Sequence, residues 1–176
     1  MNALKDYVEW KLTHSKGYMS RNLFDNTNLK VQERAFATNV TPTKTGVSYT
    51  IASNAPSNAY PRVDLVIGPA SKYAGKTITM TVSNMFSRAT KLSVRKLASS
   101  SSAQNGSELK QSGDLFYATI TIEDKDYTTE NLCIMLYCYM GSSYNHQAGD
   151  IITHNNIMVY EGSDILPYEP YGKHIK

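Results

Sequence analysis

The feature that most constrains this chain is a short alternation of apolar residues with threonine, found clearly at 77–82 and again at 116–122. Residues two apart on a strand lie on the same face, so each stretch predicts a strand with one face in the core. We expect the threonines of 77–82 to face solvent. The residues expected to face the core are Ile78, Met80, Val82, Phe116, Ile120 and Ile122.

Further short stretches have the composition of strands and are separated by turn residues such as Gly75 and Asn105-Gly106. Residues 132–140 are apolar on both faces, which predicts a central strand covered on each side. Many short strands at this spacing favour an antiparallel sandwich or barrel, and we expect an all-β, antiparallel jelly-roll β-sandwich. The other expected strands are 47–52, 63–67, 92–95 and 157–160.

The N-terminal segment differs from the rest because Leu4, Val8 and Leu12 form one stripe of a short amphipathic helix. A helix of this length is marginal alone in water and must pack on its own domain, a symmetry mate or a larger particle. We expect it to be an anchor, with Leu4, Val8, Trp10 and Leu12 at the interface. The predicted organisation is a helical or extended anchor at 1–21, a sandwich at 22–172 and a tail at 173–176.

Charge and composition exclude several classes of protein. Lys and Arg number 18 against 15 Asp and Glu, and a net charge of +3 gives no strong field for nucleic acid. No apolar run approaches the roughly 18 residues that a membrane helix needs, and the start lacks the basic and apolar regions of a signal peptide. Cys133 and Cys138 lie too far apart on one strand to pair, so we expect buried thiols.

No catalytic or metal-binding motif is evident. The four histidines are scattered, and neither a nucleophile elbow nor a phosphate-binding loop occurs. Sequence alone leaves open a carboxylate pair drawn from Asp64, Glu123 and Asp150. The acidic stretch 123–126 could bind a structural Ca²⁺, although a solvated turn is the favoured interpretation. We therefore expect a protein without enzymatic activity and without a cofactor, structural calcium being the one exception considered.

Two loops have the residue types of a saccharide site, which needs aromatic faces and a few planar polar groups. They are 55–62 and 141–147, and tyrosine, with 13 copies, is the main aromatic residue of the chain. Tyr137 and Tyr139 share a strand face with Cys133 and Met135; that face is either core or a binding groove, and core is favoured. The predicted saccharide contacts are Asn58, Tyr60, Arg62, Tyr144, Asn145, His146 and Gln147.

The C-terminal sequence NIMVYEGS at 156–163, followed by PYEPYG at 167–172, resembles the end of jelly-roll modules in tail and baseplate proteins of phages that infect Gram-positive bacteria. The segments 22–25, 49–53 and 73–80 occur in the order that this family shows. The resemblance implies a fold like that of carbohydrate-binding modules and an affinity for cell-wall saccharides. Physically, the two X-Pro steps hold the exit segment extended, so that Tyr168 and Tyr171 lie on the sandwich as a structural clamp.

We therefore expect a non-enzymatic phage structural protein that attaches to host cell-surface saccharide. Its expected partners are other virion proteins, the saccharide and further copies of itself, a trimer being one arrangement, without nucleic acid or membrane. It would reside in the virion after assembly in the bacterial cytoplasm. One alternative is a capsid decoration, tail adaptor or fibre subunit acting through protein contacts alone. Another is a secreted bacterial carbohydrate-binding module, against which the missing signal peptide counts.

Overall fold

The structure is a computed structural model that describes residues 21–84, 86–87, 89–96, 101–107, 109–140 and 145–172. The predicted helix with Leu4, Val8, Trp10 and Leu12 lies outside these residues, as does the predicted contact Tyr144. Those expectations therefore stay predictions.

The described residues form an all-β, sandwich-like fold of three antiparallel sheets. The sheet orders are β1-β4-β10-β6-β7, β11-β3-β2 and β12-β5-β9-β8. A 3-10 turn (η1, Ala70–Tyr73) joins β4 to β5, and the described part of the chain contains no helix that could cross a membrane. The strands are β1 (Val31–Ala35), β2 (Ala37–Pro42), β3 (Val47–Ile51), β4 (Arg62–Pro69), β5 (Thr77–Val82), β6 (Lys91–Lys96), β7 (Ser102–Asn105), β8 (Lys110–Ser112), β9 (Leu115–Thr121), β10 (Glu130–Tyr137), β11 (Ile151–His154) and β12 (Met158–Glu161).

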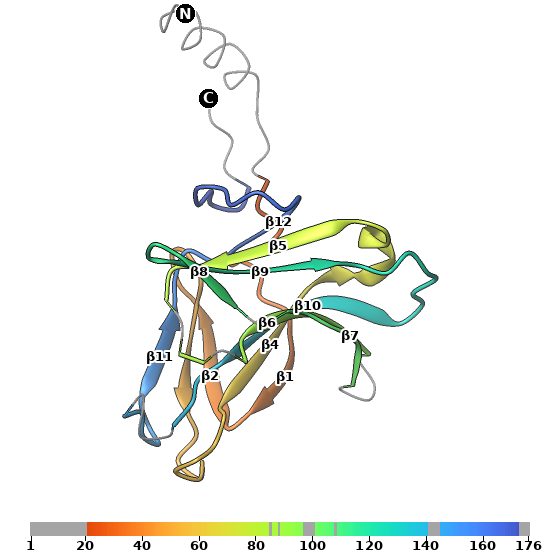
Figure 1. The fold of residues 1–176 in the computed structure, drawn as a ribbon. Helices are drawn as coiled ribbons and strands as arrows, with labels where there is room; N and C mark the ends of the chain where they lie inside the picture. Colours follow the sequence, from red (N-terminus) through yellow and green to blue (C-terminus); the bar gives the residue numbers. More distant parts are fainter. Residues whose placement is uncertain are drawn as a thin grey trace, which may run out of the picture.

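The three-stranded and four-stranded sheets are linked through β11 and β12, which follow each other in the chain. β11 pairs with β3, whereas β12 pairs with β5, and both pairings are antiparallel. The side chain of Asn84 sits at the junction, where it donates to the Thr153 carbonyl (2.5 Å) and accepts from the Asn155 amide (3.0 Å). Figure 1 shows these two sheets meeting at an angle, with the five-stranded sheet beside them.

The core lies between the five-stranded sheet and the other two sheets. β10 is the central strand, because it pairs with β4 on one side and β6 on the other. Its residues Leu132, Ile134 and Leu136 are fully buried in the core. The prediction of a central strand covered on both faces is therefore confirmed, since Cys133 and Met135 on its other face are also buried.

The expectation that the threonines of β5 face solvent was wrong for two of the three. Thr79 and Thr81 are 0% and 1% exposed, because the chain beyond β12 folds over this face. The Thr79 hydroxyl donates to the Gly162 carbonyl (2.7 Å), and the hydroxyl of Tyr160, the residue in register with Thr79, donates to the Asp164 carbonyl (2.7 Å). Alternation thus located the strand correctly but could not reveal what covers its second face.

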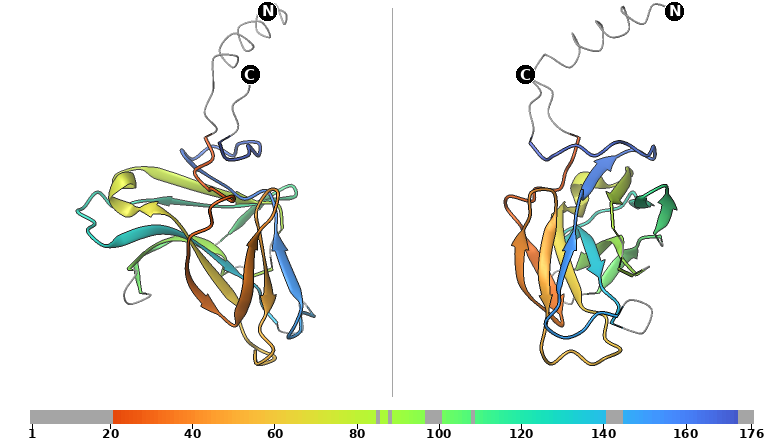
Figure 2. Two further views of the ribbon diagram at one scale, coloured as in Figure 1. Left: turned by 180° about the vertical axis from the view of Figure 1, so that it is seen from behind. Right: turned by 90° about the vertical axis from the view of Figure 1, so that its left-hand side faces the viewer.

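Both ends of the described chain leave the domain at the same place, where the buried Asn22 joins them. Its side-chain amide donates to the carbonyls of Ile157 (3.1 Å) and Glu169 (3.0 Å), while its oxygen accepts from the amides of Phe24 (2.9 Å) and Val159 (3.0 Å). Figure 2 shows, from two sides, the first and last described residues at one end of the molecule. This end lies opposite the loop between β3 and β4.

The substitution Asn22→Ala tests this joint. It removes the side-chain hydrogen-bond partner of two backbone carbonyls and two backbone amides in a site only 3% exposed, so we expect a loss of about 2–4 kcal/mol in the free energy of unfolding. Urea denaturation measures the loss, with the exposed Asn28→Ala as the matched control. Equal stability of the two variants would contradict the role given to Asn22.

Candidate functional site

The candidate site begins on the outer face of the five-stranded sheet, where β4 and β10 run side by side. Arg62 pairs in register with Tyr137, and Asp64 pairs with Met135. Residues in register share a face, so these four side chains lie on the side away from the core residues Val63 and Leu136. The favoured interpretation that Tyr137 faces the core was therefore wrong. β10 itself is apolar on this face, at Cys133 and Met135. Its sequence therefore gave no sign of the charged residues that the neighbouring strands place there.

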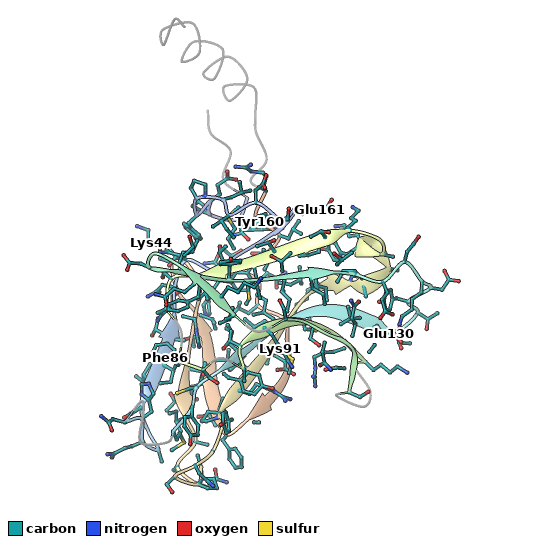
Figure 3. All side chains as sticks on the ribbon, viewed as in Figure 1. Lys44, Phe86, Lys91, Glu130, Tyr160 and Glu161 are labelled. Carbon is teal, nitrogen blue, oxygen red and sulfur yellow. The ribbon has the colours of Figure 1, made fainter. Side chains whose placement is uncertain are left out.

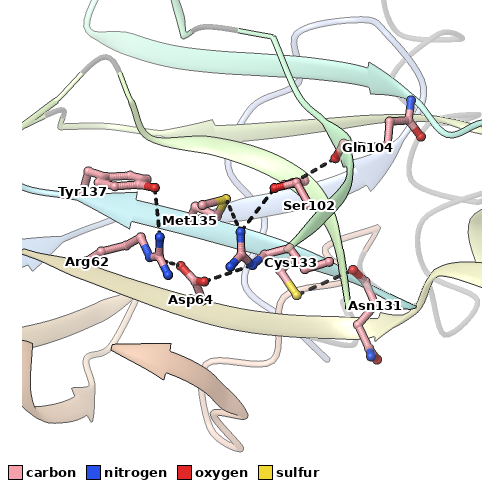
Figure 4. Close-up of polar contacts among 10 residues, drawn as sticks. Arg62, Asp64, Ser102, Gln104, Asn131, Cys133, Met135 and Tyr137 are labelled. Carbon is pink, nitrogen blue, oxygen red and sulfur yellow. Dashed lines mark hydrogen bonds and ion pairs between the residues drawn. The ribbon is translucent and has the colours of Figure 1, made fainter. Parts of the chain in front are cut away.

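A buried ion-pair network holds this face together. Asp64 is 0% exposed, and its two carboxylate oxygens contact different arginines: Oδ1 lies 2.9 Å from Arg62 Nε and Oδ2 lies 3.1 Å from Arg95 Nε (Figure 4). An unpaired carboxylate in such a place would be strongly disfavoured, but two guanidinium groups compensate it. Asp64 was one candidate for a catalytic carboxylate pair. In the structure it is instead ion-paired with two arginines.

The buried charges also affect the nearby thiol. Burial, together with the Asp64 carboxylate, raises the pKa of Cys133 to about 12, while Arg95 acts in the opposite direction. Burial likewise raises the pKa of Cys138 to about 12. Both cysteines are free and buried, as the sequence predicted.

Beyond the ion pairs, the same face continues into an aromatic platform made by Tyr60 and Tyr139. Their rings stack with centroids 4.6 Å apart and an interplanar angle of 26°, and Tyr60 is 49% exposed. The backbone brings them together because the Met140 amide donates to the Ala59 carbonyl (3.2 Å). Next to the platform, Arg62 Nη1 donates to the Tyr137 hydroxyl (3.3 Å), and the guanidinium carbon lies 5.7 Å from that ring's centroid.

A separate hollow of about 570 Å³ lies between the two loops predicted to bind saccharide. Its lining residues are Ala55, Ser57, Met140, Asn145, His146, Gln147 and Ala148. The loop after residue 144 is fixed by Asp150, whose Oδ2 accepts from the Gln147 amide (2.9 Å) and lies 3.7 Å from His146 Nδ1. The hollow thus combines polar side chains with a few apolar ones, Met140 and two alanines, a composition suited to a small polar ligand.

The predicted contacts divide between these two places. Tyr60 and Arg62 belong to the outer sheet face, together with Tyr137 and Tyr139, for which the sequence favours a place in the core. Asn145, His146 and Gln147 line the hollow, and Asn58 is exposed in the turn that ends at Ala59. Successive strand residues point to opposite faces, so Tyr139 of the platform and Met140 of the hollow lie on opposite sides of one segment. Whether these residues bind a ligand stays a prediction.

A chain of aromatic rings runs from the hollow into the core. His146 meets the edge of Phe86 (centroids 5.4 Å apart), Phe86 meets His154 (5.1 Å), and His154 stacks on Tyr49 (6.0 Å). Phe86 lies beside β11 in Figure 3.

Burial lowers the pKa of His154 to about 3, while the backbone of Asn84 acts in the opposite direction. Burial, and then Cys138, raises the pKa of Tyr49. His154 is therefore neutral at ordinary pH and serves as a core residue.

This histidine makes the fold sensitive to acid. His154 takes up a proton near pH 6.5 in the unfolded chain but only near pH 3 in the folded one, so the unfolded state binds more protons between these values. Stability is fully retained above pH 6.5 and falls by about 1.4 kcal/mol per pH unit as the pH drops toward 3. Urea denaturation from pH 7 to pH 4 measures this loss.

The matched variant is His154→Phe, which keeps an aromatic ring between Tyr49 and Phe86. The ionisable side chains near this ring chain, His146, Asp150 and Cys138, are present in both proteins, so the difference between the two pH profiles isolates His154. Parallel profiles for wild type and variant would contradict the account of a neutral buried histidine.

The acidic stretch 123–126 gives no support to a calcium site. The Glu123 carboxylate contacts the Lys125 ammonium group, and the Gln104 side chain accepts from the Glu123 amide (3.0 Å). Within the described ranges, no three histidine, cysteine or acidic side chains come together as a metal site requires. The structure therefore places ordinary polar turn contacts at this position.

Comparisons with protein-family models, with curated proteins and with solved structures found no match to this chain.

Proposed function

We propose that this chain is a non-enzymatic structural protein of a phage particle, carrying a module that attaches to host cell-surface saccharide. The observation on which the proposal depends is the stacked pair Tyr60–Tyr139, with Tyr60 exposed, next to the ordered Arg62. An aromatic face contacts the C–H groups of a sugar ring, and a guanidinium donates to its oxygens. The platform and the neighbouring Arg62 provide both kinds of group on one sheet face.

The proposal includes a jelly-roll topology, which the strand order supports. If β11 and β12 are counted as one bent strand, one layer has the order β3, β11/β12, β5, β9 and the other has β4, β10, β6, β7. The connections from β3 to β4, β5 to β6 and β9 to β10 each pass from one layer to the other. Two interleaved layers with such crossings are the arrangement of a double Greek key.

The positions of the termini favour attachment at one end and binding at the other. The joint around Asn22 holds both described ends of the chain together, and the loop that carries Tyr60 is at the opposite end (Figures 1 and 2). An anchor formed by residues 1–21 would therefore leave the platform facing away from the particle. Repeated copies, as in a trimer, would strengthen weak individual sites through their effective concentration.

A second candidate is a subunit that acts only through protein contacts, and the outer face of the three-stranded sheet favours it. Ile151 is 72% exposed there, and Phe36, just before β2, is 42% exposed. Phe36 also has a positive φ of 51°, an unusual conformation for a bulky residue that is often found at functional positions. This candidate predicts no affinity for saccharide.

The substitution Tyr60→Ala tests the binding role. It removes the exposed ring of the platform, so we expect the affinity for purified host cell-wall polysaccharide to fall about tenfold, measured by calorimetric titration of the full chain. Tyr171→Ala is the matched control, because Tyr171 is 43% exposed and lies near Val66 and Ile67, well along β4 from Tyr60. No binding by the wild-type oligomer would exclude the adhesion role, and equal losses in both variants would exclude the platform.

Removing residues 1–20 tests the anchor while keeping Arg21, which pairs with Glu169 at 2.5 Å. We expect the shortened chain to bind polysaccharide normally, to unfold at nearly the same temperature and to be absent from assembled particles. Particle composition and thermal unfolding are the two measurements. Normal incorporation would refute the anchor, and a large loss of stability would mean that the segment packs on its own sandwich.

A further inference from the structure

We propose that Asp64 is the positioning residue of this site: it fixes Arg62 across Tyr137, so that the guanidinium meets a pair of oxygen acceptors on a sugar seated on Tyr60. The inference rests on the proposed function and assigns the residues that set its specificity. Neither composition nor motif pointed to Asp64 in this role, because its partners come from other positions along the chain.

The first step is the geometry of the carboxylate. Asp64 Oδ2 contacts Arg95 Nε (3.1 Å), and Arg95 Nη1 is itself held by the Ser102 hydroxyl (3.2 Å) and by Met135 Sδ (3.6 Å). Asp64 is thereby fixed from the β6 and β7 side of the sheet. Its other oxygen, Oδ1, contacts Arg62 at 2.9 Å (Figure 4).

The second step is the effect on Arg62. A free arginine loses considerable side-chain entropy when it is ordered, and that cost weakens binding if the ligand must order it. Here Nε contacts Asp64 and Nη1 donates to the Tyr137 hydroxyl, and two such contacts set the plane of the guanidinium before any ligand arrives. The Arg62 side chain is 17% exposed and still reaches solvent, whereas that of Arg95 is 4% exposed.

The third step is the place of Arg62 relative to the platform. Tyr60 is two residues before Arg62, and Tyr139 is two residues after Tyr137. Positions two apart on adjacent extended segments share a face, so Arg62 lies on the same sheet face as the stacked rings, one cross-strand pair away. In the proposal, a sugar ring seated on Tyr60 extends along this face to Arg62.

The chemistry of the group defines the ligand. A planar guanidinium matches two oxygens set side by side, whereas an ammonium group acts as a point charge. Two neighbouring hydroxyls of a neutral sugar and the oxygens of an acidic substituent share this pattern. The experiment below distinguishes the two sources by comparing an acidic polysaccharide with its charge-neutralised form.

The experiment is a double-substitution cycle on the full chain, with affinity for host cell-wall polysaccharide measured by calorimetric titration. Arg62→Lys keeps the charge and removes the planar donor pair, so we expect affinity to fall about tenfold. Asp64→Asn releases Arg62, and we expect a loss of about fivefold in the wild-type background. In the Arg62→Lys background the same change should cost less than about twofold, because the group it positions is gone.

The control is Leu65→Ala, one residue along β4 and facing the core, which lowers stability without touching the outer face. A loss of affinity for Leu65→Ala equal to that of Asp64→Asn would reduce Asp64 to a purely structural role and overturn the inference. So would full additivity of the two substitutions. Should Asp64→Asn fail to fold, Asp64→Glu takes its place, because it keeps the charge and displaces the carboxylate by one methylene group. Wild-type affinity in that variant overturns the inference.

The proposed function fails separately. If the wild type binds no polysaccharide, the adhesion role is lost and this inference with it. If the wild type binds and Tyr60→Ala abolishes binding while Arg62→Lys does not change it, the adhesion role stands and only the inference fails. A greater effect of Arg62→Lys on the acidic polymer than on its neutralised form identifies an acidic group, and equal effects identify a hydroxyl pair.

Discussion

The fold depends on the burial of β10 from both sides. A strand in the middle of a five-stranded sheet has its backbone fully paired, and its two rows of side chains must each find cover. The inner row, Leu132, Ile134 and Leu136, meets the other two sheets. Within the described part of the chain no further layer covers the outer row, and long side chains from neighbouring strands provide its cover, namely Arg62 and Arg95 around Asp64.

This arrangement of two arginines around Asp64 links the stability of the five-stranded sheet to the proposed recognition of saccharide. Arginines that shield Met135 and Cys133 must be neutralised and ordered, and Asp64 does both at once. The ordering extends along β4 and β10 toward the end of the molecule, where Tyr60 and Tyr139 leave a stacked surface in solvent. The same sheet face is therefore a buried electrostatic network at one end and an open aromatic platform at the other. The termini leave from the far side of the domain, which keeps the platform accessible.

The sequence predicted the strands whose apolar residues alternate or run together, and β5 was placed within its observed bounds of Thr77–Val82. Short polar strands such as β8 (Lys110–Ser112) were missed, because they contribute few apolar residues and depend on a stronger neighbour. Likewise, no local pattern could show that Asp64 is buried, since Arg95 comes from a strand 31 residues away along the printed sequence. The residues of the two loops were identifiable by type, but their division between platform and hollow required the paired backbone at Ala59 and Met140.

The central claim is that saccharide binds on the outer face of the five-stranded sheet, next to the ordered arginine. The most direct measurement is an NMR titration of the full chain with fragments of host cell-wall polysaccharide, following backbone amides and the Nε–Hε groups of arginine. The account predicts saturable shifts at residues 58–62 and 137–139 and at the Arg62 Nε–Hε group, with little change around β12. Shifts confined to the three-stranded sheet near Ile151, or none at all at saturating polysaccharide, would contradict it.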